Sequence, residues 1–249
     1  MQQPTTTPQR GDILKALVEI EHHEIAKYCQ SLSIDGELAQ SVSLRLNQGQ
    51  NIWASRGSLL AYSDGVDWSL KVPGGAAKAV SRMMAGEGAS LTYIECKRAG
   101  AEVILTANQA GKLVTWDLSR GPIVCMAGSF VAALGDVNID VTVARSAGAA
   151  LFGGGGLFMQ KLSGTGIVLL HGSGDFIERQ LQPGEKLLVS TGNLAVFSGN
   201  VSYNVRGVGG CFKSLIGGEG LFMTEMTGPG WVMLQSLKKL PAAGANAIT

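Results

Sequence analysis

The chain has little charge and few aromatic side chains. Of its 249 residues, 16% are charged and 6% are aromatic, the formal net charge is +1, and Lys and Arg form no cluster. Proteins that follow the phosphates of nucleic acids need such clusters, so these figures argue against a nucleic-acid partner. The longest apolar stretch, residues 147–159, contains five glycines and is too short to span a bilayer.

Cysteine is scarce and shows no metal-binding or redox spacing. No two cysteines form a CxxC motif, so we expect free thiols in a reducing compartment. We recognise no secretory leader and therefore expect a cytoplasmic location. The four cysteines are Cys29, Cys96, Cys125 and Cys211.

Residues typical of catalysis are equally rare. His22 and His23 are neighbours and point in different directions on a helix, so they cannot chelate one ion as an i, i+4 pair could. His171 ends an apolar stretch, where a polar residue is ordinary. The nucleophile pattern G-x-S-x-G is absent, and Gly111-Lys112 fails the P-loop pattern. We expect no enzymatic activity, no cofactor and no metal site.

The chain does contain one long pattern that occurs three times. Each copy opens with Leu-x-x-Gly, and the opening leucines are 72 and then 63 residues apart. A Gly-Ser or Gly-Asn pair, a turn dipeptide followed by valine, and a glycine-rich stretch come next in each copy. Such internal repeats indicate three similar structural units. The opening leucines are Leu46, Leu118 and Leu181.

Within each copy the apolar residues alternate with polar ones, as in half-buried strands. Val42, Leu44 and Leu46 show this period of two. The turn dipeptides predict three two-residue β-hairpins, and Gly164-Thr-Gly166 and Gly228-Pro-Gly230 predict tight turns before the last strands of copies two and three. The prediction is an all-β protein of three fused sandwich-like units. The three dipeptides are Asp64-Gly65, Gly135-Asp136 and Gly199-Asn200.

The residues before the repeats predict a helix. Asp12 can cap it, and its apolar residues follow a spacing of three and four. The helix lies outside the repeats and is expected to pack on the β body or on a partner subunit. Its apolar residues are Leu14, Leu17, Val18, Ile25 and Tyr28.

Short connectors rich in small and apolar residues recur between the turn dipeptide and the last strand of each copy. They span residues 76–85, 147–152 and 211–216. One interpretation is a connector folded over the end of the sandwich. The other is a set of apolar tips that contact a membrane or a protein partner. The candidate binding residues on these tips are Met83, Met84, Phe152 and Phe212.

Two of the glycine-rich segments resemble a known family. Gly217-Gly-Glu-Gly-Leu-Phe-Met-Thr-Glu-Met-Thr-Gly-Pro-Gly-Trp-Val-Met-Leu-Gln-Ser236 is similar to the C-terminal signature of the mitochondrial-biogenesis family, a family of unknown function with a TRAP-like fold. Gly153-Gly-Gly-Gly-Leu-Phe-Met-Gln-Lys-Leu-Ser-Gly-Thr-Gly166 resembles its central copy. The first copy departs from the pattern, with Ala89-Ser-Leu91 in place of Leu-Phe-Met.

The resemblance implies three fused TRAP-like units, related to a short double-stranded β-helix, and a homo-oligomer such as a trimer. It implies no known enzymatic activity. The corresponding division is an N-terminal tail and helix over 1–30, repeats over 33–110, 111–175 and 176–240, and a tail over 241–249.

These observations lead to two main hypotheses of function. The first is a non-enzymatic structural or scaffold protein that assembles through β edges and apolar tips, with a membrane surface or a protein as a further partner. The second is a small-molecule-binding module with an apolar site between units. RNA binding and enzymatic activity rank below both, although residues from different units could converge on a site that linear sequence does not show.

Overall fold

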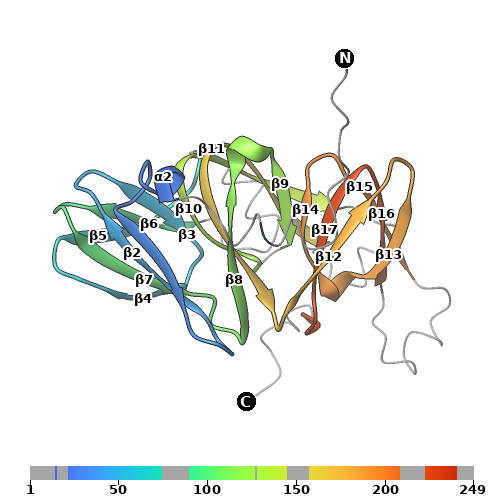
Figure 1. The fold of residues 1–249 in the computed structure, drawn as a ribbon, viewed down its shortest axis with the longest axis horizontal. Helices are drawn as coiled ribbons and strands as arrows, with labels where there is room; N and C mark the ends of the chain where they lie inside the picture. Colours follow the sequence, from blue (N-terminus) through green and yellow to red (C-terminus); the bar gives the residue numbers. More distant parts are fainter. Residues whose placement is uncertain are drawn as a thin grey trace.

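The computed structural model describes residues 15, 22–74, 90–126, 128–144, 157–207 and 222–239, and it is an all-β structure (Figure 1). The helix α2 (His22–Ile25) lies within the predicted N-terminal helix, and Lys15 is also helical. Residues 26–28 form a turn, so the helix ends at Ile25 and the prediction that it includes Tyr28 is wrong. Residues 1–14 and 16–21 fall outside the described residues, so the start of the helix stays a prediction.

Three sets of strands follow one another along the chain. Set one is preceded by β1 (Ser31–Asp35) and comprises β2 (Ser41–Leu46), β3 (Asn51–Ala54), β4 (Leu59–Tyr62), β5 (Val66–Lys71), β6 (Leu91–Cys96) and β7 (Ala101–Thr106). Set two comprises β8 (Gly111–Asp117), β9 (Ile123–Met126), β10 (Phe130–Ala144) and β11 (Leu157–Ser173). Set three comprises β12 (Phe176–Leu181), β13 (Lys186–Ser190), β14 (Leu194–Ser198), β15 (Ser202–Gly207), β16 (Phe222–Thr227) and β17 (Gly230–Gln235).

The same antiparallel pairing occurs in all three sets. The first group of each set is β2–β7–β4, β8–β11–β10 or β12–β17–β14. The second group is β3–β6–β5, β9–β11–β10 or β13–β16–β15. In set two, β10 and β11 are long enough to run through both groups. The TRAP-like form of the units and their bounds stay predictions.

The three predicted hairpins are wrong, because the strands on either side of each dipeptide do not pair with each other across a turn. At Asp64-Gly65 the chain leaves β4, which pairs with β7, and enters β5, which pairs with β6. Gly199-Asn200 makes the same switch between groups, whereas Gly135-Asp136 lies inside the unbroken strand β10. Likewise Gly164–Gly166 is part of β11 and not a turn. Alternation identifies a strand but carries no information on its partner.

Neighbouring sets are joined edge to edge. β3 pairs with β10, and β9 pairs with β14, both antiparallel. Each junction therefore fuses the second group of one set with the first group of the next. Figure 1 shows the result as three sets side by side along the long axis, with β4 toward one end and β13 toward the other.

Buried apolar side chains form three clusters, and each cluster combines residues of neighbouring sets. The alternation predicted for β2 is confirmed, since Val42, Leu44 and Leu46 are fully buried. At the centre of the molecule the Trp116 and Trp231 rings lie 4.9 Å apart between centroids, which links the second and third sets. These cores leave the polar strand ends and turns to line the hollows between sets.

Candidate functional site

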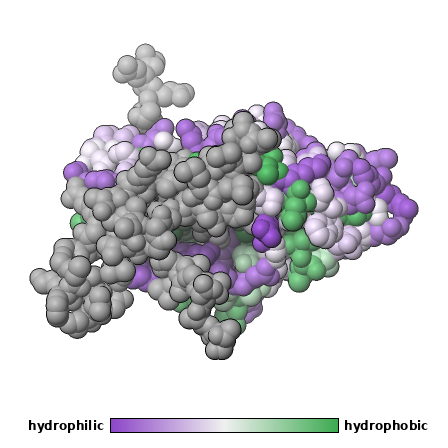
Figure 2. Space-filling view, turned by 180° about the vertical axis from the view of Figure 1, so that it is seen from behind, coloured by the Kyte–Doolittle hydropathy of each residue, from purple (hydrophilic) through white to green (hydrophobic). Residues whose placement is uncertain are grey.

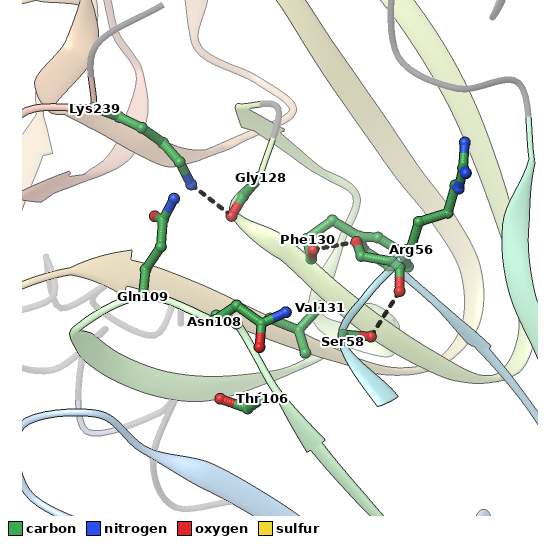
Figure 3. A pocket seen from close by; sticks show the side chains of 11 residues that line it. Arg56, Ser58, Thr106, Asn108, Gln109, Gly128, Phe130, Val131 and Lys239 are labelled. Atoms are coloured by element: carbon green, nitrogen blue, oxygen red, sulfur yellow. Dashed lines mark hydrogen bonds between the residues drawn. The ribbon is translucent and has the colours of Figure 1, made fainter. Parts of the chain in front are cut away.

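A cavity of about 160 Å³ opens where the first two strand sets meet (Figure 3). Its walls come from the turn before β4, the segment after β7, the start of β10 and the residues after β17. Polar and apolar residues both contribute to them. The lining residues are Ser55, Arg56, Ser58, Thr106, Ala107, Asn108, Gln109, Gly128, Phe130, Val131 and Lys239.

The charged residues of the cavity lining are both cations. The Lys239 Nζ donates a hydrogen bond to the Gly128 carbonyl at 2.9 Å, and Figure 3 shows the Gln109 amide beside it. Arg56 lies on the opposite wall and is exposed. With two cations and amide and hydroxyl groups in its lining, this cavity suits a small anion or a small polar molecule. It is below the roughly 300–1,000 Å³ of typical drug-sized ligand sites.

The repeated Gly-Ser or Gly-Asn pair makes an equivalent contact in each set, and Ser58 and Gly128 of the first two pairs line the cavity. The Ser58 carbonyl accepts from the Thr106 N–H, and the Ser129 carbonyl accepts from the His171 N–H, both at 2.8 Å. In set three the Asn193 side-chain amide donates to the Gln235 carbonyl at 3.0 Å. Each contact ties the start of one strand to the end of its partner. The motif is therefore explained by sheet construction.

Two further contacts close the cavity across the junction. The Ser55 hydroxyl donates to the Phe130 carbonyl at 2.6 Å, from β3's end to β10 (Figure 3). The Asn108 amide donates to the Gly57 carbonyl, and its backbone has a φ of +56°, a left-handed conformation that Asn tolerates better than most residues. The cavity is thus bounded by turns whose geometry is fixed by local hydrogen bonds.

His171 of β11 is 1% exposed. Neither of its ring nitrogens has a hydrogen-bond partner in the described part of the chain, and the same holds for the buried Ser129 hydroxyl. Burial, with a smaller contribution from the charge of Lys239, lowers the pKa of His171 to about 4, although the backbone of Gln109 acts to raise it. The imidazole is therefore neutral at pH 7.

The candidate binding residues predicted from the sequence stay predictions. Met83, Met84, Phe152 and Phe212 lie outside the described residues. His22 and His23 are on α2, far in sequence from His171 in β11. Of the carboxylates, Glu185 accepts from the Gln182 N–H at 2.8 Å and so stabilises a turn.

Cys29, Cys96 and Cys125 are free and buried, while Cys211 lies outside the described residues. Burial raises the pKa of the Cys29 thiol to about 11, so it stays protonated at neutral pH. Among the described residues, no group of three or more His, Cys, Asp or Glu side chains is placed to hold a metal ion. No helix in the described ranges has the length and apolar character needed to cross a membrane.

Sequence reasoning missed the residues that line the cavity. Arg56, Asn108 and Lys239 belong to turns and strand ends that carry no motif. The Gly-Ser pair was the available signal, because it recurs beside each strand end. The convergence of Arg56 with Lys239 depends on the fold of all three sets.

Comparison with known proteins places the chain among uncharacterised relatives. The sequence model of a family described as "Mitochondrial biogenesis AIM24" matches residues 32–237. An uncharacterised protein of Streptococcus pyogenes serotype M6 is 26% identical over 211 residues, which cover 82% of this chain and 84% of the relative. A crystal structure of a Streptococcus pyogenes protein aligns with a TM-score of 0.70 at 22% identity, covering 84% of this chain and 94% of that one, and so shows a shared fold.

Proposed function

The chain belongs to the AIM24 mitochondrial-biogenesis family, and from this premise we propose that it is a non-enzymatic structural protein that assembles with copies of itself. Its three strand sets serve in this proposal as fused TRAP-like units. A membrane surface or another protein is a further partner of the assembly, contacted through the apolar connectors.

The observation that carries the proposal is that two of the open strand edges, β4 and β13, lie toward opposite ends of the molecule (Figure 1). β4 is the last strand of the four-stranded sheet β1–β2–β7–β4, and β13 is the first of the three-stranded sheet β13–β16–β15. Open edges offer unpaired N–H and C=O groups, which proteins usually cover. Leu60 and Tyr62 of β4 and Leu188 of β13 are among the exposed large apolar residues.

The exposed apolar residues favour strand edges over a broad sheet face as the contact. On the face shown in Figure 2, coloured residues are mostly hydrophilic, and hydrophobic ones form narrow areas. A wide apolar docking face is not visible among the coloured residues of that view. Edge pairing needs little apolar area, because main-chain hydrogen bonds supply much of the affinity.

Static light scattering over a concentration series tests the proposal. We expect a discrete oligomer at micromolar concentration that dissociates on dilution. A mass equal to one chain at every concentration up to about a hundredfold above the micromolar range would overturn it.

A second candidate function is the binding of a small anion in the cavity between the first two sets. The apolar site expected between units stays a prediction, and this cavity is lined by both apolar residues such as Phe130 and Val131 and polar ones. The positive charge of Lys239 favours an anion, and the Arg56 guanidinium, which points away from the other labelled side chains in Figure 3, adds positive charge at the rim.

Inorganic phosphate is the probe for this second function. We expect millimolar phosphate to raise the melting temperature relative to sodium chloride of equal ionic strength. Lys239→Gln should abolish that rise, whereas Lys238→Gln, next to it and outside the cavity lining, should retain it. Equal shifts with phosphate and chloride would contradict the anion site.

A further inference from the structure

We propose that a second copy of this chain binds head to tail, with its β4 paired antiparallel to β13 of the first copy. The inference rests on the proposed self-assembly and adds the surface, the partner strand and the register. It comes from the two junctions inside the chain, which supply a geometric template for a third one between chains.

The two internal junctions use the same strand positions. At the first junction β3, the first strand of the second group in set one, pairs with β10, the third strand of the first group in set two. At the second junction β9 and β14 occupy the same two positions and also pair. In set three β13 occupies the position of β3 and β9, and in set one β4 occupies the position of β10 and β14. Within the described residues these two have no pairing on that side.

The register at both junctions is the same. β4, β10 and β14 each carry a bulge directly after their first residue, at Leu59/Ala61, Phe130/Ala132 and Leu194/Val196. This bulge aligns Ala61 with Ala132 and Val196. The facing strands β3, β9 and β13 are aligned by the glycine-rich stretch of each copy. The residue four positions after its last glycine is Thr92, Gln160 or Thr224. These residues pair with Ala54, Cys125 and Val189, which are therefore equivalent.

Applying this register to the free edges gives the cross-chain pairs directly. Ala132 lies opposite Ala54, and Val196 opposite Cys125, so Ala61 should lie opposite Val189. The next pair is Ala133 with Trp53 at one junction and Phe197 with Val124 at the other. Its counterpart between chains is Tyr62 with Leu188.

Exposure singles out this same pair. Tyr62 is 50% exposed and Leu188 is 58% exposed. The counterparts of Tyr62, Ala133 and Phe197, already have partners and are 1% and 0% exposed. The counterparts of Leu188 are Val124, which is buried, and Trp53, which is partly buried. The apolar residues at this position are therefore less exposed where a junction exists than where it is missing, as expected of a surface that a second copy covers.

Polar groups around the pair also agree with the register. At the second junction the ladder continues one residue beyond Ser198, where the Gly199 N–H donates to the Pro122 carbonyl. In the aligned copies Asp64 corresponds to Gly199 and Lys186 to Pro122, so Asp64 should lie opposite Lys186 between chains. These opposite charges are complementary. At the other end, Ser190 takes the place of Ser55, and its buried hydroxyl has no hydrogen-bond partner among the described residues, whereas that of Ser55 donates across the first junction.

The contact is heterologous, since two different edges meet. Such contacts generate a ring if the rotation closes and an open filament if it does not. The free four-stranded and three-stranded sheets would fuse into one seven-stranded sheet across the contact.

Cross-linking in trans tests the register. Tyr62→Cys is prepared in one batch of the full chain and Leu188→Cys in another, and the two are mixed and oxidised. The pair corresponds to a hydrogen-bonded position with Cα atoms about 5.5 Å apart, within the range that a disulfide bridges. We expect a covalent heterodimer in the mixture and little in either batch alone. The matched control pairs Leu188→Cys with Leu70→Cys, an equally exposed leucine on the edge strand β5.

A second variant separates this inference from the proposed function. Leu188→Lys should reduce association at least tenfold in light scattering, whereas Leu70→Lys should leave it unchanged. An oligomer that persists in Leu188→Lys and gives no 62–188 cross-link overturns the inference and leaves self-assembly intact. A parent protein that stays monomeric overturns both.

Discussion

His171 shows how a polar side chain can be held in the core of this protein. The imidazole is 1% exposed, and a Cβ on Gly111 would lie 2.6 Å from its Nε2 and 2.1 Å from the Gly172 carbonyl oxygen. The neutral ring therefore fits against a strand that approaches very closely. The equivalent residues in the other sets are Thr106 and Gln235, which are uncharged at every ordinary pH.

This burial predicts a pH dependence of stability. The pKa of His171 is about 4 in the folded protein, against an ordinary value of 6.5, so between these values the unfolded chain binds the proton and the folded chain does not. The free energy of unfolding therefore has its full value, as far as His171 is concerned, above pH 6.5, and it falls by roughly 3 kcal/mol at most as the pH drops toward 4. Urea unfolding of the parent and of His171→Gln at pH 7, 6, 5 and 4.5 measures this. Equal pH slopes for the two proteins would contradict the prediction.

Gly111 offers a second prediction at the same place. Its φ of +153° and the close backbone of Gly172 leave no room for a side chain. Gly111→Ala should lower the free energy of unfolding by roughly 3 kcal/mol, through a clash that rigid backbone cannot relieve. The control is Gly49→Ala, where φ is +83° and nothing lies within 4 Å of an added Cβ, so that only the left-handed backbone costs about 1 kcal/mol. Similar losses in both would exclude the clash as the cause.

At the scale of the strand, the same position has different roles in different sets. Phe197 of β14 is fully buried, and its ring packs against Tyr203 with centroids 5.5 Å apart. Its counterpart Tyr62 of β4 is half exposed, and its hydroxyl accepts from the Trp68 indole at 3.3 Å. What distinguishes the two strands is whether a neighbouring set lies against their edge.

Truncating both residues should separate folding from assembly. Phe197→Ala should cost about 3–5 kcal/mol of unfolding free energy, because it leaves a cavity in the core. Tyr62→Ala should change the stability of the dissociated chain by no more than about 0.5 kcal/mol, since exposed truncations cost little. Denaturation at a concentration where light scattering shows one chain measures both. A loss of several kcal/mol in Tyr62→Ala would mean that β4 is covered within the chain.

At the scale of the whole molecule, assembly links stability to concentration. A partner that binds only the folded chain adds about 1.4 kcal/mol for each tenfold rise in its free concentration above the dissociation constant. The melting temperature of the parent should therefore rise with protein concentration. In Leu188→Lys it should stay constant over the range where the parent's rises, while Leu70→Lys should follow the parent. A melting temperature of the parent that does not change with protein concentration would contradict self-assembly through the strand edges of the folded chain.

Much of the architecture could be predicted from residues alone. The threefold repeat predicted an all-β protein, and the period of two at Val42, Leu44 and Leu46 identified the buried face of a strand. The glycine-rich signatures identified the family. These features are local, because the pleat fixes which side chains face the core and turn glycines fix where the backbone can bend.

Strand partners and the cavity were decided only by the tertiary structure. Asp64-Gly65 looks like a hairpin turn, yet β4 and β5 pair with different strands, since hydrogen-bond partners are chosen by contacts between residues far apart in sequence. Arg56 and Lys239 line one cavity for the same reason. Likewise only the pairing of all three sets showed that Tyr62 and Leu188 lie on edge strands, because an edge is defined by which strands pair with it and not by the local sequence.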